Sequence, residues 1–123
     1  ATTEIYTLSL HDALPIYMED ADTLHLFRVA PRAWFADGER IDLEGVRSYF
    51  GRIDARVRSH VGEGYIEATV TCDPERKPSR LAVRLPHPQG KKPVRVTGGR
   101  YDETTESVLI DDFDGEASIR LEY

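Results

Sequence analysis

The sequence has few of the residues that form covalent cross-links, and it lacks long apolar runs. Only one of its 123 residues, Cys72, is a cysteine. An internal disulfide is therefore excluded, and cysteine usage does not indicate the redox compartment. No apolar run approaches the roughly 18 residues that a membrane-spanning helix requires. The sequence therefore excludes a disulfide scaffold and predicts no membrane partner.

An excess of basic charge is also missing. The chain carries 16 Lys and Arg residues against 22 Asp and Glu residues, which gives a formal net charge of −6. Nucleic-acid binding needs a basic stripe that follows the phosphate backbone, whereas acidic and basic residues are interleaved here. This pattern is typical of a solvated surface, and we expect no nucleic-acid partner.

The first sixteen residues, Ala1–Ile16, resemble a translated sequencing adapter. Their sequence, ATTEIYTLSLHDALPI, can be back-translated in a single frame into the common short-read adapter, and a Tyr17 codon keeps that frame. Segments that arise from sequencing are left out of fold reasoning. We therefore expect residues 1–16 to be poorly packed, and residues 17–123 to be one small domain from a larger protein.

Alternation of apolar and polar residues dominates residues 17–123, and helical spacing is nearly absent. A period of two is typical of strands that bury one face and expose the other. The clearest hairpin joins the runs 53–58 and 66–72 across Gly62-Glu63-Gly64. The only segment that could form a helical turn is 43–49. About eight short strands with frequent turns predict an all-β fold, an antiparallel β-sandwich.

Side chains that could carry out chemistry are present but do not form a recognisable site. The densest carboxylate cluster comprises Asp111, Asp112, Asp114 and Glu116. It lacks a closing glutamate at calcium-loop spacing, and its carboxylates lie in one turn instead of facing each other across a cleft, as glycoside hydrolysis requires. It is therefore expected to be a solvated turn.

Histidine and serine give no stronger signal. The histidines of residues 17–123 are His25, His60 and His87. Their positions do not match metal-ligand spacing, and no Gly-x-Ser-x-Gly motif surrounds a serine. We predict no catalytic residue, no metal site and no cofactor in this chain.

A family resemblance rests on several segments of the chain. LHLFRVAPRAWF (24–35), a following DG turn and strand, and SYFG (48–51) resemble a pattern of bacterial glycoside hydrolases. HVGEGYIEATV, LAVRLPHPQGKKPVRVTGG and EASIRLEY also look like parts of the same domain, although Gly98-Gly99 replaces its usual Asn-Gly turn and the proline before the SYFG-type segment is missing. In those enzymes the pattern follows a catalytic (α/α)6 toroid and begins a C-terminal β-sandwich. The resemblance implies a non-catalytic accessory domain that packs against a missing N-terminal catalytic domain of the same parent chain.

Four aromatic residues are the candidate contact residues of this domain: Trp34, Phe35, Tyr49 and Phe50. Aromatic faces can stack on sugar rings, so the alternative function is an autonomous carbohydrate-binding module with a polysaccharide partner. The same rings could instead pack inside the sandwich or against the catalytic domain. A flat exposed row of rings would favour sugar binding, and burial or a lone apolar patch would favour packing.

Overall fold

The computed structural model describes residues 5–8, 17–20, 23–28, 30–48, 51–73, 75 and 77–123, with the backbone alone for 5–8, 17–20, 47 and 48. Its strands are β1 (Ile5–Leu8), β2 (Tyr17–Asp20), β3 (Thr23–Leu26), β4 (Arg40–Ser48), β5 (Gly51–His60), β6 (Tyr65–Cys72), β7 (Arg80–Arg84), β8 (Arg95–Thr97), β9 (Arg100–Asp102), β10 (Ser107–Ile110) and β11 (Glu116–Glu122). Two 3-10 turns, η2 (Arg32–Phe35) and η3 (Val61–Glu63), complete the described elements. No helix in this part of the chain is long and apolar enough to cross a membrane.

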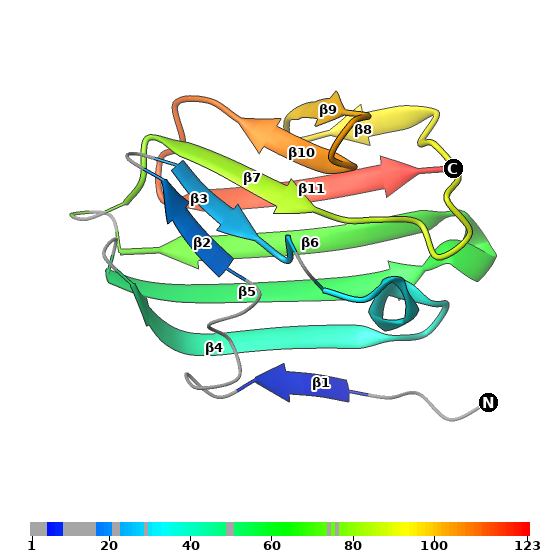
Figure 1. The fold of residues 1–123 in the computed structure, drawn as a ribbon, viewed down its shortest axis with the longest axis horizontal. Coiled ribbons are helices and arrows are strands. Elements are labelled where there is room, and N and C mark those ends of the chain that lie inside the picture. Colours follow the sequence, from blue (N-terminus) through cyan, green and yellow to red (C-terminus); the bar gives the residue numbers. More distant parts are fainter. Residues whose placement is uncertain are drawn as a thin grey trace.

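The strands form two sheets that face each other (Figure 1). The larger sheet has the order β1-β4-β5-β6-β11-β8, and the smaller sheet has the order β2-β3-β7-β10-β9. All pairings are antiparallel except those of β1 with β4 and of β3 with β7. The predicted all-β sandwich is therefore confirmed, with more strands than expected because short strands such as β9 were missed.

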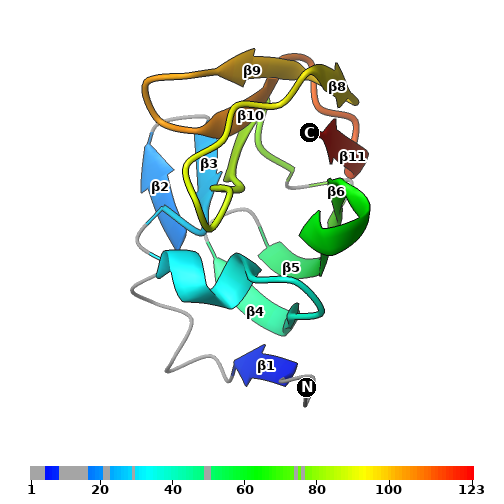
Figure 2. The ribbon, with the colours of Figure 1, turned by 90° about the vertical axis from the view of Figure 1, so that its right-hand side faces the viewer.

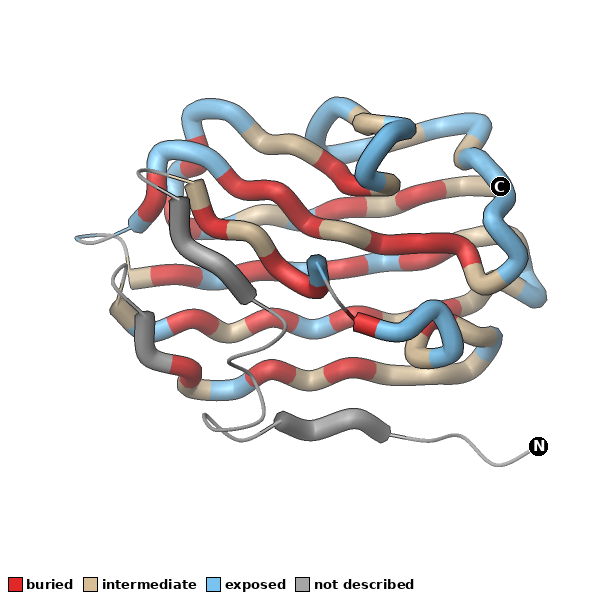
Figure 3. The backbone as a smooth tube through the Cα atoms, in the orientation of Figure 1, coloured by how far each residue is buried: buried red, intermediate tan, exposed pale blue. Residues whose placement is uncertain are grey.

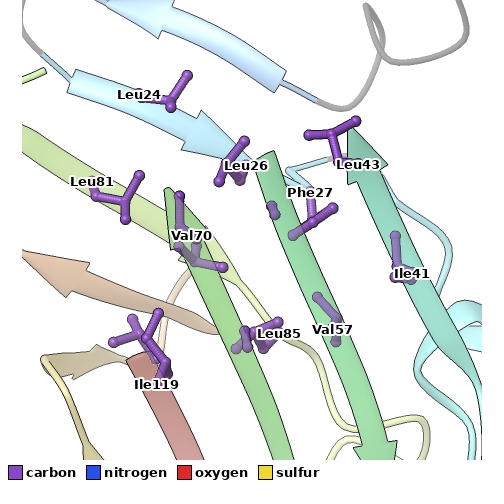
Figure 4. Packing of buried hydrophobic residues seen from close by; sticks show 14 of the residues in the cluster. Leu24, Leu26, Phe27, Ile41, Leu43, Val57, Val70, Leu81, Leu85 and Ile119 are labelled. Atoms are coloured by element: carbon purple, nitrogen blue, oxygen red, sulfur yellow. The ribbon is translucent and has the colours of Figure 1, made fainter. Parts of the chain in front are cut away.

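Alternating burial produces the core between the sheets. Along β6, Ile66, Ala68, Val70 and Cys72 are buried, and the residues between them are exposed. The same alternation is visible along the other long strands (Figure 3). Leu24, Leu26 and Leu81 of the smaller sheet belong to the same buried cluster as Val57 and Val70 of the larger sheet (Figure 4). Burial of each such side chain stabilises the fold by roughly 1.5–3 kcal/mol.

The predicted hairpin is confirmed, whereas the predicted helical turn is wrong. β5 and β6 pair from Ile53↔Cys72 to His60↔Tyr65, with η3 between them. The segment 43–49 begins inside β4, where a bulge at Gly45 (φ +62°) shifts the register between Leu43 and Val46. The side chains of Leu43 and Val46 are both buried. Because the bulge adds a residue, they stand three apart, a spacing that imitates a helix.

Of the adapter-like segment, only Ile5–Leu8 lies within the described residues. This β1 strand pairs in parallel with β4, from Ile5↔Arg40 to Leu8↔Leu43, at the edge of the larger sheet. A sheet edge can accept a strand of almost any sequence, since backbone groups make the hydrogen bonds. The adapter origin of residues 1–16 therefore stays a prediction.

Gly98 and Gly99 connect β8 in the larger sheet to β9 in the smaller sheet. Gly98 has φ +96°, and a Cβ atom there would lie 2.1 Å from the Ser118 carbonyl oxygen. A Cβ atom on Gly99 would lie 2.6 Å from Cγ1 of Val108. The chain can cross between the sheets here only because both residues lack side chains.

We expect Gly98→Ala to destabilise the fold by about 3 kcal/mol or more, because it adds a backbone clash to an unfavourable φ angle. Gly90→Ala is the matched control, since Gly90 also has a positive φ (+75°) but has open space around its Cβ position. That control should cost only about 1–2 kcal/mol. Urea unfolding of both variants measures the difference, and equal losses would contradict the close approach.

Candidate functional site at the loop end of the sandwich

The structure buries one of the four candidate aromatic residues completely. Phe35 is 0 % exposed, and its ring lies edge-on to Phe27 with centroids 6.4 Å apart. Trp34 is half-buried and packs against the core, while Tyr49 and Phe50 lie outside the described residues. Every aromatic side chain that the structure describes is buried or half-buried. Phe35 is therefore unavailable for stacking on a sugar.

One end of the sandwich gathers polar groups from distant parts of the chain. We call it the loop end, formed by η2, η3 and the loop 85–94; it faces the viewer in Figure 2. Arg32 of η2 makes a bidentate ion pair with the carboxylate of Glu106, with one nitrogen–oxygen distance of 2.9 Å. The same guanidinium donates to the carbonyl oxygen of His87 at 2.8 Å. Arg32 thus ties three separate segments together.

A second arginine holds the segment that leads into η2. Arg84, at the end of β7, donates to the carbonyl oxygen of Ala30 at 2.7 Å and approaches that of Phe27 at 3.4 Å. Phe27 has φ +60°, an unusual backbone conformation for a residue other than glycine. The contacts of Arg84 satisfy carbonyl groups in this irregular stretch, so its role is to fix the backbone.

Burial sets the protonation of the neighbouring groups. It lowers the pKa of His87, with smaller contributions from Lys91 and Arg32, so the ring is neutral near pH 7. Its Nδ1 atom accepts a hydrogen bond from the Gln89 backbone N–H at 2.9 Å, and its ring meets Tyr123 with centroids 4.7 Å apart. Burial also raises the pKa of Tyr123. These groups are held neutral and engaged, without an activated nucleophile among them.

The thiol of Cys72 and the carboxylates of the acidic turn lie elsewhere in the fold. Burial raises the pKa of Cys72 to about 12, which keeps its thiol protonated at neutral pH. In the acidic turn between β10 and β11, Asp111 accepts a hydrogen bond from Arg100 at 3.2 Å. Asp114 in the same turn accepts one from the Glu116 backbone N–H at 3.1 Å. The carboxylates of this turn are exposed or paired locally, as a solvated turn requires.

The three histidines within the described residues lie on different elements of the fold. His25 is on β3, His60 stacks on Tyr65 with centroids 4.8 Å apart, and His87 is buried in the loop 85–94. Within the ranges that the structure describes, no group of three or more His, Cys, Asp or Glu side chains is arranged to hold a metal ion.

Three of the open cavities in the described part of the chain differ in their lining. The first, of about 530 Å³, covers the outer face of the larger sheet and is lined by Glu44, Arg52, Asp54, Ala55, Arg56, Thr69 and Thr71. The second, of about 350 Å³, lies on the smaller sheet near Ala82, Arg84 and Glu106. The third, of about 360 Å³, opens at the loop end and is lined by Ala36, Asp37, Val61, Gly62, His87, Pro88, Gln89 and Lys91.

The sequence did not reveal the contacts of Arg32 and Arg84, because the residues that meet are far apart in the chain. Arg32 and Glu106 are 74 positions apart, and Arg84 and Ala30 are 54 apart. A local signal, the prolines that flank His87 and precede Arg32, marks the loops without pairing them. No family model, curated protein or solved structure matches the chain.

Arg32→Lys is expected to lower the free energy of unfolding by about 1 kcal/mol, because lysine cannot make the bidentate pair and also reach the His87 carbonyl. Arg52→Lys is the matched control: its side chain is 67 % exposed and pairs only with its neighbour Asp54. The control should change the unfolding free energy by less than about 0.5 kcal/mol. Urea unfolding of both variants measures the two losses. Equal losses would contradict a stabilising role for the contacts of Arg32 with Glu106 and His87.

Stability is also expected to fall as the pH drops below the ordinary His87 pKa of 6.5. The folded-state pKa is lowered, so the unfolded chain takes up the proton first and the stabilisation is complete only above that value. Urea unfolding at about pH 7.5 and about pH 5.5 should show a smaller loss in His87→Gln than in the unmodified protein. An identical loss in both proteins would show that His87 does not cause this pH dependence.

Proposed function

We propose that this chain is a non-catalytic accessory β-sandwich from a bacterial glycoside hydrolase, which packs against and supports a catalytic domain preceding it in the parent chain. The observation that carries the proposal is that the charged side chains of Arg32, Glu106 and Arg84 bind other parts of the fold at the loop end. Arg32, Glu106 and Arg84 bind one another's segments and the backbone, so these three side chains are engaged within the fold. This arrangement stabilises loops and supplies no acid/base pair.

The segment that carries the family resemblance also supports a structural role. LHLFRVAPRAWF spans β3 and η2, and Leu24, Leu26, Phe27 and Phe35 in it are fully buried. One of its two arginines, Arg32, forms the ion pair at the loop end. The residues of the motif thus build the domain, which is the behaviour expected of an accessory module. Fold alone assigns no function, so the parent enzyme is inferred from the resemblance.

The alternative of sugar binding through aromatic faces has less support. It needs rings that present a flat, exposed face, and Phe35 is buried in the core. Trp34 packs against the same core from η2. The aromatic residues near η2 therefore fit the packing role better than the stacking role.

The coding sequence upstream of Tyr17 tests the origin of the chain. We expect an overlapping read to continue in frame into the paired helices of a toroid catalytic domain, because the accessory sandwich follows such a domain in the enzymes that the sequence resembles. A start codon and promoter directly before Tyr17, without a toroid, would contradict the proposal.

The support role is tested in the parent protein once that sequence is known. Removing residues 17–123 should lower the Tm of the catalytic domain, whereas kcat measured well below the Tm should stay within about twofold, since no catalytic group is lost. Full-length protein with Gly98→Ala is the matched comparison and should lower the Tm in the same direction as the deletion. An unchanged Tm in the deletion would exclude support.

A further inference from the structure

Charges of both signs line each of the three cavities described above, so none of them selects one class of ligand. Arg52 and Asp54 pair with each other in the first, and Arg84 and Glu106 in the second bind other parts of the fold. The edge of the larger sheet at β4 is different, because a strand is already docked on it. In Figure 1, β1 lies beyond β4 at the lower edge of that sheet.

The contact between β1 and β4 is a pairing of two strand backbones. It runs in parallel from Ile5↔Arg40 to Leu8↔Leu43 and stops before the bulge at Gly45. Strands that join a sheet edge gain affinity from main-chain hydrogen bonds, and their side chains add specificity. Figure 2 also shows β1 on the outer side of β4, away from the strands of the smaller sheet. An extended segment can therefore dock on β4 from outside the sandwich.

Two charged side chains at the start of β4 have buried atoms that lack a partner within the described residues. The Nε atom of Arg40 and one carboxylate oxygen of Glu39 are buried and make no hydrogen bond there. The residue opposite Arg40 on β5 is Arg58, which has the same charge and pairs with Asp42 at 2.8 Å. Buried polar groups without a partner destabilise a fold, so a partner is expected for them in the complete protein.

The strand that occupies the edge does not match it. The residue opposite Arg40 on β1 is Ile5, and isoleucine has no side-chain hydrogen-bonding group. Ile5 also belongs to the adapter-like segment 1–16, whose sequence is expected to be unrelated to this domain. The sequence of β1 and the unpaired Nε atom of Arg40 are separate observations, and both indicate that another segment belongs on the β4 edge.

We propose that the β4 edge is a docking surface for an extended segment of another domain or protein, which carries a carboxylate opposite Arg40. The backbone of that segment would pair with residues 40–43. Its carboxylate would accept from the Arg40 guanidinium, and a small polar residue would lie opposite Asp42. Apolar residues would lie opposite Ile41 and Leu43, whose side chains are buried. This inference goes beyond the proposed support role and does not rest on it, because any strand with this pattern fits.

A designed peptide tests the docking surface. The probe is acetyl-Thr-Glu-Val-Thr-Val-Thr-amide, with its glutamate placed to face Arg40, and its matched control has lysine instead of glutamate. Both are added to the 15N-labelled chain with Tyr6→Pro and Thr7→Pro, the released variant, because adjacent prolines remove strand N–H groups of both directions and detach β1. The glutamate peptide should shift the amide signals of residues 40–43 saturably with a Kd of about 1 mM or below, and the lysine peptide should bind about tenfold more weakly.

Variants of the released chain separate the role of Arg40 from general charge effects. Arg40→Gln should make the two peptides bind equally, whereas Arg40→Lys should keep the preference for glutamate because it keeps the charge. Arg56→Gln is the matched control, since Arg56 is an exposed arginine on the neighbouring strand β5, opposite Asp42. It should leave the preference within about twofold of its original value.

A second measurement within the chain does not depend on the folding of the released variant. Ile5→Glu places a carboxylate opposite Arg40, and Ile5→Lys places a like charge there. The urea midpoint of Ile5→Glu should therefore lie above that of Ile5→Lys. The difference should disappear when Arg40→Gln is added to both.

Three results would overturn the proposal. The first is the absence of saturable shifts at residues 40–43 with the glutamate peptide up to about 5 mM. The second is an equal Kd of the two peptides, or an equal urea midpoint of Ile5→Glu and Ile5→Lys. The third is a concentration-dependent dimer of the released variant whose shifts centre on β4, which would make a second copy of the chain the occupant.

Discussion

Leu26 of the smaller sheet and Val57 of the larger sheet belong to one apolar layer, and each sheet depends on the other to keep that layer dry. A single sheet with one apolar face would expose that face to water, so neither sheet is stable alone. The loops, the ion pairs and the cavity all take their positions from this layer. The chain can cross between the sheets at Gly98 only because glycine permits the close approach to β11.

The loop end follows from the same constraint. Where the strands stop, the apolar layer would be open, and η2 covers it by inserting Phe35 beside Phe27. Backbone groups in such an irregular cover need partners. Arg84 and Arg32 supply them by donating to the carbonyl oxygens of Ala30 and His87. The charges of Arg32 and Arg84 therefore complete the fold at this end.

Rigidity at the loop end also shapes its cavity. A hydrogen bond joins the distant segments of Asp37 and Gly62. The loop that carries His87 is tied to η2 through Arg32. Hydrogen bonds between distant segments can hold a concave surface in a fixed shape.

Much of the sandwich could be predicted from period-two alternation, because burial of one sheet face imposes that period on every strand. The hairpin of β5 and β6 is the clearest case, with alternating Ile66, Ala68 and Val70 on the buried face. The bulge in β4 could not be predicted, since the three-residue spacing of Leu43 and Val46 is shared by helices. Only pairing with β5 resolves that ambiguity.

By itself, the sequence determined the all-β class, the alternation of buried and exposed faces and the position of most turns, because these depend on neighbouring residues. The tertiary structure decided which strands pair, which sheet each strand joins and which charges meet at the loop end. Arg32 and Glu106 make contact across 74 positions only after both sheets are in place. Such contacts leave no periodic trace in the sequence, because they depend on where the chain ends up in space.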